Sequence, residues 1–420
     1  MNIFRAADIL LPVNADFSKW SVVACDQYTS EPSYWEKAEK IAAGSPSTLN
    51  IIFPEAYLGK CDEEKRISDI NETMLRYERE GIFKEYKNSM IYVERRQANG
   101  KVRHAVIGAV DLEAYDFNAG SQSPIRATEG TILSRIPPRK KIRKDAPLEL
   151  PHIIMLVDDR KHRIVEPLTE QKDRFEKLYD FDLMLGGGHI TGRLLDAEAV
   201  KNVLNGIDAL ADTEEYESKY GKADGGMLIA AVGDGNHSLA TAKACWDEIK
   251  KTLSAEEREN HPARFALAEL MNIHDESLEF EAIERVMFDA EPDEVLKALY
   301  EYYPETSETD NGGQKVTAVY GTTEKTLYIK GSKSNLAVGT IQRFIDEYIK
   351  IHGGSVDYIH GADVTRSLAS EPHRIGFIVD KMSKNELFET VIKDGALPRK
   401  TFSMGEAHDK RYYLEAKKIR

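Results

Sequence analysis

The sequence predicts an α+β fold in which a mixed sheet is combined with helices in several subdomains. Runs with strand-like and helix-like patterns alternate along the chain, but without the regular βαβ period that would indicate a doubly wound parallel sheet. The clearest pair of elements lies near the middle, where the continuous apolar run 227–232 indicates a buried strand. This run leads through a glycine-containing turn directly into a helical run at 238–253.

The first third of the chain is expected to contain a β-hairpin. Residues 89–96 and 102–112 are rich in β-branched side chains, and the pair Asn99-Gly100 between them is typical of a hairpin turn. The next segment, 118–124, is small and polar and contains glycine and proline, so we expect a loop there.

The residue patterns in the middle of the chain predict alternating strands and helices. A basic stretch at 134–145 precedes a strand at 152–158, and a helix is expected over 169–181 with Thr169 as its N-cap. Residues 196–220 have a helical composition, and 263–273 indicate a further strand.

The last part of the chain follows a linker predicted at 304–314, which has Asp310-Asn311-Gly312-Gly313 at its centre. A hairpin at 315–320 and 325–330 is expected next, and the pattern after it predicts a helix at 340–351, a strand at 375–379 and a helix at 384–393 that ends near Gly395. We therefore expect an N-terminal α/β region at 1–125, a central domain at 126–303 and a C-terminal α+β domain at 304–420.

Composition limits the classes of partner. Lys and Arg number 57 and Asp and Glu 71, so the formal net charge is −14, and 41% of the residues are hydrophobic. This is typical of a soluble globular protein, and the acidic balance argues against general nucleic-acid binding and against an anionic membrane surface. The three cysteines are far apart and form no CxxC pair, which favours a reducing compartment. With charged residues at the N-terminus and only short apolar runs, a cytoplasmic location is expected.

The turn between the central strand and its helix is the strongest candidate site. It has the sequence Gly233-Asp234-Gly235-Asn236-His237, followed by Ser238. A helix start offers unpaired N–H groups and a positive dipole end, which suits a phosphate. Asp234 can hold Mg²⁺ or orient a hydroxyl, and His237 can donate to a phosphate or exchange a proton. The spacing lacks the third glycine of a dinucleotide fingerprint, and an ordinary junction with Asn236 or Ser238 as N-cap is the open alternative.

A second glycine-rich segment runs from 186 to 193. Gly187 and Gly192 have the spacing of a P-loop, but Arg193-Leu194 stands where that motif has Lys and Ser or Thr. A Walker A motif is therefore rejected. The remaining hypotheses are an anion-binding backbone nest at Gly187 and Gly188, helped by His189 and Arg193, and a plain surface turn.

Two further segments supply cations. Arg126, Arg135 and Arg139 have guanidinium groups suited to phosphate or carboxylate, whereas the neighbouring cluster 140–144 is interpreted as a solvated face. The tail 397–420 crowds Arg399, Lys400 and other polar residues next to aromatic ones, so we expect it to be docked on the protein. Its role, as a wall or as part of a site, stays open.

Several long strings resemble one protein family across nearly the whole chain. The chain is similar to the DUF1015 family of bacterial and archaeal proteins in FRAADILLP, VVACDQYTSEP, AVGDGNHSLATAK, HPARFALAELMNIHD, VDYIHG and LPRKTFSMGEAHDKRYYLEAKKI. More distantly, the Asp-Gly-Asn-His turn resembles the Asp-Gly-His-His-Arg motif of free-serine kinases of the ParB/sulfiredoxin superfamily. That resemblance implies a ParB/sulfiredoxin-like strand–turn–helix that seats a phosphate at residues 233–237, with Asp234 near the reacting hydroxyl.

The sequence departs from the kinase motif at two positions. Asn236 stands where the motif has its first histidine, and Ser238 where it has a phosphate-binding arginine. The resemblance therefore implies that another cation, such as Arg126, Arg135 or Lys400, takes over that contact.

Three functions are compatible with these patterns. The first is a phosphotransferase that uses ATP or ADP with Mg²⁺ and acts on a small, serine-like hydroxy-metabolite. The second is a nucleotide- or metabolite-binding regulatory protein without turnover, and the third is a metal-dependent hydrolase with Asp234, His237 and Glu269. We expect a small anionic ligand or nucleotide as partner, no nucleic acid or membrane, and a homodimer.

Overall fold

The computed structural model describes residues 3–222, 225–398 and 400–420. They form two compact units. The first unit comprises Met1–Ala127, Thr131–Leu278 and Gly405–Arg420, and the second comprises Thr128–Gly130 and Glu279–Met404.

These units divide the chain differently from the three predicted segments 1–125, 126–303 and 304–420. The hairpin strands β5 (Ile91–Arg96) and β6 (Val102–Asp111) share one sheet with β14 (Phe265–Asn272), because β6 pairs with both β5 and β14. The first two predicted segments therefore belong to one unit up to residue 278, and the tail from Gly405 returns to that unit.

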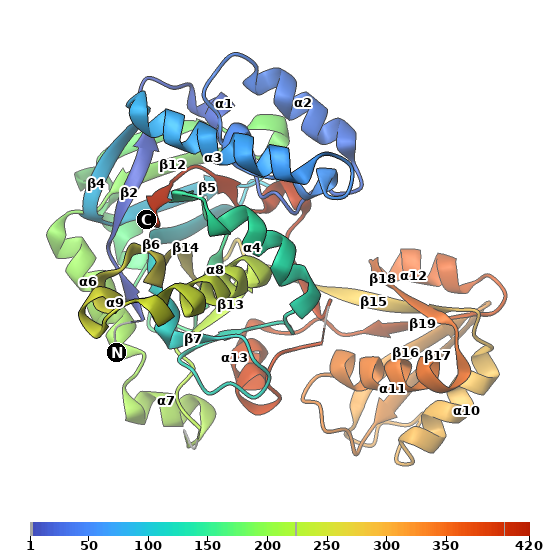
Figure 1. Cartoon of the computed structure of the whole chain (residues 1–420). Helices are drawn as coiled ribbons and strands as arrows, with labels where there is room; N and C mark the ends of the chain where they lie inside the picture. The colour runs from blue at the N-terminus through green and yellow to red at the C-terminus, as the bar shows by residue number, and fades with distance from the viewer. Residues whose placement is uncertain (1–2, 223–224, 399) are drawn as a thin grey trace. The chain divides into compact units, whose positions relative to one another are not determined.

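The first unit is built on a large mixed sheet (Figure 1). Its strand order is β11-β12-β5-β6-β14-β10-β13-β8-β7, and β1 pairs with β6. The pairs β10–β14, β13–β8 and β7–β8 are parallel, and the other pairs are antiparallel. The predicted α+β class is confirmed. The bounds not yet given are β1 Phe4–Arg5, β7 Tyr115–Asp116, β8 Ile125–Ala127, β10 Ile154–Val157, β11 Glu176–Asp182, β12 His189–Leu194 and β13 Ala230–Asp234.

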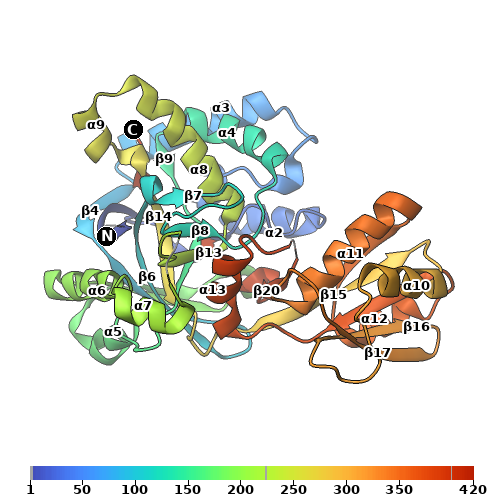
Figure 2. The same ribbon diagram turned by 90° about the horizontal axis from the view of Figure 1, so that it is seen from below.

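Both faces of this sheet are buried, which explains why its central strands are continuous apolar runs. Along β14, Leu267 packs into one core cluster and Ala266 and Ala268 into the other. Helices α2 (Pro32–Ala42) and α3 (Glu63–Arg79) contribute to the first cluster, and α6 (Ala197–Ala209) and α8 (Asn236–Ile249) contribute to the second. Helix α4 (Ile136–Lys144) contacts α8, as Figures 1 and 2 show.

Smaller elements complete the first unit. Strand pairs join β2 to β4, β3 to β21 and β9 to β22, so the C-terminal tail is docked by backbone pairing, as predicted. In the described part of the chain, no helix has both the length and the apolar character needed to cross a bilayer. The bounds are β2 Ala7–Pro12, α1 Phe17–Trp20, β3 Val22–Val23, β4 Phe83–Ser89, β9 Leu148–Glu149, α5 Glu166–Gln171, α7 Thr213–Tyr220, α9 Ala255–Asn260, β21 Tyr412–Tyr413 and β22 Lys417–Lys418.

The helix predicted over 169–181 is wrong. Only α5 is helical there, and a short 3₁₀ turn at Lys172–Arg174 leads into strand β11. Thr169 lies inside α5 and contacts the Tyr92 hydroxyl at 2.8 Å, so it is not an N-cap. Pairing of β11 with β12 provides backbone partners that outweigh the local helical pattern.

The second unit contains a sheet of order β17-β16-β19-β15-β18, with β20 paired to β15. The predicted hairpin, helix 340–351, strand 375–379 and helix 384–393 are confirmed as β16–β17, α11, β19 and α13. The predicted linker 304–314 lies inside this unit, between α10 and β16. The bounds are β15 Phe280–Phe288, α10 Pro292–Tyr302, β16 Gln314–Tyr320, β17 Thr323–Ile329, α11 Ala337–His352, β18 Ser355–His360, α12 Ala362–Ala369, β19 Arg374–Val379, α13 Lys384–Lys393 and β20 Phe402–Met404.

Candidate functional site

The central strand, turn and helix have the predicted arrangement. Strand β13 ends at Asp234, Gly235 has φ +76°, and α8 begins at Asn236. The N-cap is Gly235, so neither Asn236 nor Ser238 caps the helix. A Cβ on Gly235 would lie 3.0 Å from the Ile153 Cα, and the left-handed backbone is itself unfavourable for other residues. Glycine therefore lets the chain turn tightly against the segment that leads into β10. The first-turn amides of α8 follow directly after Gly235.

His237 lies in the first turn of α8 and is neutral at neutral pH. Its Nε2 accepts a hydrogen bond from the Ile132 backbone N–H at 3.2 Å. Burial lowers the pKa of His237 to about 4, with further lowering by Arg139 and Arg135 and an opposing effect of Asp26. Two of the three predicted arginines therefore exert their charge at this turn.

The docked tail adds a lysine to the turn. The Lys410 Nζ lies 3.5 Å from the Asp234 Oδ2, and the Asp234 Oδ1 accepts from the Gly235 N–H at 2.9 Å. Burial raises the pKa of Asp26, but His152, a hydrogen bond from Gln27, Arg139 and Lys410 outweigh it, so the net pKa is lowered. Asp26 and Asp234 thus both experience the charge of Lys410, and Asp26 is a second carboxylate at this site.

His152 connects the turn to the tail. Its Nε2 lies 2.8 Å from the Ser238 Oγ, and its Nδ1 lies 2.8 Å from the Tyr413 Oη. The Asp26 Oδ2 is 3.8 Å from the same Nε2. The Tyr413 Oη also accepts from the Cys25 backbone N–H at 3.2 Å. The imidazole is buried, and its orientation is fixed from both sides.

A cavity of about 150 Å³ adjoins this histidine. Ser238, His152 and Tyr413 form one part of its wall, and most of the rest is apolar. The residues lining it are Cys25, Ile51, Ile52, Phe53, Glu55, Leu58, Met74, Pro138, Arg139, Ile142, Arg143, Ala146, Leu148, Glu149, Leu150, His152, Ser238, Thr241 and Tyr413.

Sequence reasoning did not single out Asp26, His152, Lys410 or Tyr413. The signal for three of them was present, since Asp26 lies in VVACDQYTSEP and Lys410 and Tyr413 lie in the tail string that carries the family resemblance. His152 had no comparable signal, because it stands in a short strand-like run with no motif around it.

Arg126 is not brought to the turn, which corrects the prediction. It lies in β8, opposite Ala231 of β13. Its guanidinium donates to the carbonyls of Ser123 and Gly226 at 2.9 and 2.8 Å. Gly226 precedes the start of β13, whereas the turn follows its end, so Arg126 supports the opposite end of that strand.

Lys400 belongs to the second unit, where its carbonyl accepts from Arg285 at 3.0 Å. Arg399 lies outside the described residues. A contact of Lys400 with a phosphate stays a prediction.

The glycine-rich segment 186–193 does not supply free anion-binding side chains. The two ring nitrogens of His189 each lie 2.7 Å from a carboxylate, of Asp182 and Asp180. The bond to Asp182 raises the pKa of His189 most, partly offset by burial. Arg193 is paired with Glu94 at 3.0 Å. The prediction that His189 and Arg193 assist an anion is corrected, because both are already bound to acids.

The two predicted glycines of that segment have other surroundings. Gly188 has φ +80° and packs against the Arg96 carbonyl, and the Gly187 carbonyl accepts from the Arg95 guanidinium at 2.9 Å. Arg95 also donates to the Lys410 carbonyl at 2.5 Å. The loop therefore helps to hold the tail, and its strand β12 is separated from β13 by four strands of the described sheet.

Glu269 is not a metal ligand. It is buried in β14 between two arginines, with Arg103 Nε at 2.8 Å and Arg411 Nε at 2.9 Å. Burial raises its pKa, but the charges of Arg103 and Arg411 outweigh this, so the net pKa is lowered. Across residues 3–222, 225–398 and 400–420, no group of three or more His, Cys, Asp or Glu could hold a metal ion by itself.

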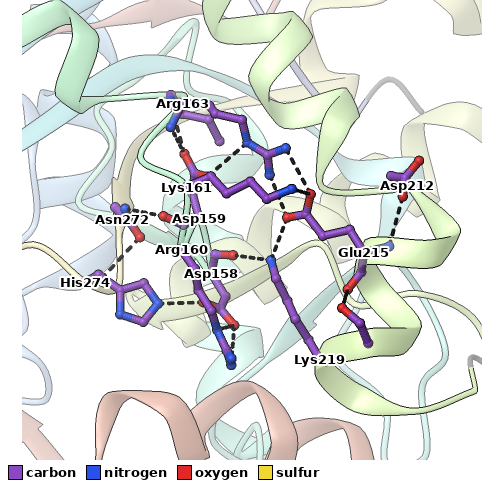
Figure 3. Close-up of polar contacts among 12 residues, drawn as sticks. Asp158, Asp159, Arg160, Lys161, Arg163, Asp212, Glu215, Lys219, Asn272 and His274 are labelled. Carbon is purple, nitrogen blue, oxygen red and sulfur yellow. Dashed lines mark hydrogen bonds and ion pairs between the residues drawn. The ribbon is translucent and has the colours of Figure 1, made fainter.

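A second polar cluster lies at the far end of β10, beyond Val157 (Figure 3). His274 contacts Asp158 at 2.6 Å, and Arg163 contacts Asp159 at 3.3 Å. Glu215 pairs with Arg163 at 2.9 Å. Asp234 pairs with Ile154 at the start of the same strand, so this cluster and the turn lie at opposite ends of it. Its charges neutralise one another, which is typical of a structural network.

The fold and the site define an α+β protein with a glycine turn at the start of a helix, next to a carboxylate pair, a lysine and a buried histidine. A family model described as protein of unknown function (DUF1015) matches residues 8–348. The chain belongs to the DUF1015 family, and the resemblance found in the sequence is confirmed. No curated protein matches the chain.

Several solved structures are similar at low identity. SbnI with a C-terminal truncation from Staphylococcus aureus is 11% identical with a TM-score of 0.36, covering 73% of this chain and 82% of that one. A free serine kinase mutant in complex with ADP is 11% identical with a TM-score of 0.39, covering 76% and 93%. A conserved hypothetical protein from Pyrococcus furiosus is 11% identical with a TM-score of 0.35, covering 75% and 92%. At these values the similarity supports no transfer of activity.

Proposed function

We propose that the turn at residues 233–238 binds the phosphates of ATP or ADP and that the protein is a phosphotransferase acting on a small hydroxy-metabolite. The observation that supports this most is that Lys410 lies 3.5 Å from Asp234 at the start of α8, where the charges of Arg139 and Arg135 also lower the pKa of His237. Phosphoryl transfer needs such positioning and charge neutralisation more than covalent help from the protein.

The phosphate seat consists of backbone and cations. Helix α8 has 14 residues, and its N-terminal amides and dipole favour an anion. Gly235 adopts the left-handed backbone from which the helix starts, and this conformation is unfavourable for residues with a side chain. Lys410 and the exposed Arg135 supply the charge that the resemblance assigned to an arginine at the position of Ser238, whereas Arg139 is paired with Glu55.

A carboxylate at the turn fits a magnesium ion that arrives with the nucleotide. Mg²⁺ in nucleotide sites is bound by one or two carboxylates together with phosphate oxygens and water. Asp234 would hold it, since this carboxylate lies at the turn and is partly exposed. The ion would neutralise charge on the phosphates, while Asp234 orients the acceptor hydroxyl.

His237 would contact the phosphates as a neutral group. Its Nε2 already accepts a backbone hydrogen bond, so the proton of the neutral ring is on Nδ1, which can donate. A neutral histidine adds a hydrogen bond without adding charge beside Arg135 and Arg139.

Binding without turnover is the second candidate. It is favoured by Ser238, whose hydroxyl is engaged with His152 at 2.8 Å and offers no charge to a transferring phosphoryl group. In that case the same turn binds a nucleotide, and no product is formed.

Calorimetric titration with ATP and with ADP, each with and without Mg²⁺, tests the proposal. We expect Mg²⁺-dependent binding that weakens at least tenfold in Lys410→Met. Lys418→Met is the matched control, because Lys418 lies on the same tail, is half-exposed and pairs with Glu78 at 3.7 Å. Absence of binding at millimolar nucleotide would refute both candidates.

Turnover separates the two candidates. Release of ADP from ATP in the presence of an acceptor panel, lost in Asp234→Asn, supports the phosphotransferase. Binding that survives in Asp234→Asn, with no ADP formed by the parent protein, supports the regulatory role.

A further inference from the structure

The cavity beside the turn has a composition that points to a class of acceptor. It is enclosed mainly by aliphatic and aromatic side chains, among them Ile51, Phe53, Met74 and Ile142. An apolar cavity of this volume, about 150 Å³, accommodates a molecule the size of benzene. The apolar part of a ligand seated here therefore has roughly six non-hydrogen atoms.

The charges in the cavity wall are already paired. Arg139 forms an ion pair with Glu55, and Arg143 forms one with Glu149 at 2.6 Å. A ligand carboxylate or ammonium would have to compete with these pairs and lose its water. The pairing therefore favours a ligand body without charge, unlike an amino acid.

The polar end of the cavity is the Ser238–His152–Tyr413 chain. If the imidazole proton is on Nδ1, it is donated to the Tyr413 Oη, and the Nε2 lone pair faces the Ser238 hydroxyl. The Ser238 Oγ and the His152 Nε2 are 2.8 Å apart, which is within the range that proton transfer to a general base requires. Asp26, 3.8 Å from Nε2, stabilises the imidazolium that forms after proton transfer.

Resting on the proposed phosphotransferase function, we propose that this cavity binds the phosphoryl acceptor, an uncharged alcohol with a compact apolar body, and that Ser238 and His152 accept its proton. Ser238 lies in the first turn of α8 and also in the cavity wall, so an alcohol at its hydroxyl is next to the phosphate seat.

The reaction balances in atoms and charge. The acceptor oxygen forms a bond to the γ-phosphorus of ATP, and the bond from that phosphorus to the β–γ bridging oxygen breaks, so ADP leaves. The acceptor proton passes to the Ser238 oxygen while the Ser238 proton passes to the His152 Nε2. His152 then releases the proton to solvent.

Binding of cyclohexanol, compared with L-serine and glycerol, tests the acceptor class on the whole chain. Saturation-transfer NMR is expected to show cyclohexanol bound at millimolar concentration, with intermolecular contacts to the Met74 methyl group, and to show neither serine nor glycerol there. Ala146→Leu fills the cavity and should weaken cyclohexanol binding at least tenfold. Ala43→Leu, at an exposed alanine outside the cavity wall, is the matched control.

Separate readouts distinguish failure of this inference from failure of the proposed function. Nucleotide binding without cyclohexanol binding, or serine bound at Met74 in place of cyclohexanol, would overturn the acceptor class and leave the nucleotide site standing. Cyclohexanol binding without nucleotide binding would overturn the phosphotransferase. If Ala146→Leu does not fold, the NMR contacts between cyclohexanol and the Met74 methyl group in the parent protein show whether the alcohol binds in the cavity.

The proton relay has its own test. Ser238→Ala should reduce the rate of ATP-dependent phosphorylation of the alcohol at least a hundredfold, measured at saturating cyclohexanol so that a change in affinity does not enter. An unchanged phosphorylation rate in this variant would exclude Ser238 as relay.

Discussion

Gly235 is the residue on which the geometry of the turn depends. Its φ is positive, and a Cβ there would lie 3.0 Å from the Ile153 Cα and 3.2 Å from the His152 carbonyl oxygen, in the segment just before β10. Gly235→Ala is expected to destabilise the protein by ~1–2 kcal/mol from the left-handed backbone, and by more because the new Cβ meets backbone atoms. Denaturant unfolding measures this effect, and nucleotide titration should show weakened binding.

Gly81→Ala is the matched control for this substitution. Gly81 has φ +66°, and a Cβ added there would have no atom within 4 Å, so only the backbone effect applies. Gly81→Ala should lower the free energy of unfolding by less than Gly235→Ala does, and it should leave nucleotide binding unchanged. Equal losses of stability at the two sites would contradict the close packing at the turn.

His237 is the residue whose titration reports on the site. Its pKa of about 4 lies below the ordinary value of 6.5, so the folded protein binds fewer protons than the unfolded chain between these values. The stability contributed by neutral His237 is complete above pH 6.5 and is lost as the pH falls toward 4. Unfolding free energies of the parent protein should therefore fall more steeply over this range than those of His237→Gln.

Removing a neighbouring positive charge should shift the pKa of His237. Arg139→Gln is expected to raise the pKa of His237, because burial and then Arg139 are the leading causes of its depression. An NMR titration of the imidazole carbon resonances measures the change. Arg193→Gln, which removes a cation on β12 paired with Glu94, should leave the titration unchanged. A normal His237 pKa in the parent protein would contradict the described surroundings.

Among the elements, β14 connects the sheet to the tail through one side chain. Glu269 bonds Arg103 of β6 and Arg411 of the tail, and all three are almost fully buried. Glu269→Gln removes the charge partner of the buried Arg103, while Arg411 keeps Glu415 at 2.7 Å. Removing one partner of a buried ion pair typically costs about 3–5 kcal/mol. Chemical denaturation should show this loss.

An exposed pair provides the comparison for Glu269. Glu198 contacts Arg174 at 3.0 Å with 72% of its side chain exposed, so Glu198→Gln should change stability by less than about 1 kcal/mol. Equal denaturation midpoints for Glu269→Gln and Glu198→Gln would show that Glu269 does not hold the tail.

The docked tail is the element that completes the site. Strands β21 and β22 pair with β3 and β9, and this pairing sets Lys410 beside Asp234 and Tyr413 beside His152. The sequence predicted a docked tail from its aromatic residues. It left open whether the tail forms part of a site, and the structure shows that it does contribute side chains at the turn.

At the scale of the whole molecule, the chain is organised as two compact units. The second unit has its own sheet and its own buried side chains, including Val286, Val316, Ile341 and Phe377. A fragment of residues 279–404 is therefore expected to fold alone, with a cooperative thermal transition followed by circular dichroism. A fragment without a transition would show that this unit depends on the first.

Local patterns in the sequence were sufficient to predict many of the elements and the residue types at the turn. Apolar periodicity and glycine placement predicted β13, α8, α11 and both hairpins, because these depend on neighbours within a few residues. The same reasoning failed at 169–181, where β11 is formed by pairing with β12 rather than by local preference.

The residues that join the turn from distant parts of the chain are known only from the folded structure. Asp26, His152 and Lys410 come from three separate parts of the chain, and no local pattern specifies which strands pair or where a tail docks. The same folding paired Glu269, His189 and Arg193 with opposite charges and turned Arg126 to the other end of β13. Residue types establish what chemistry is available, whereas burial and pairing across the sheet determine which groups remain free to use it.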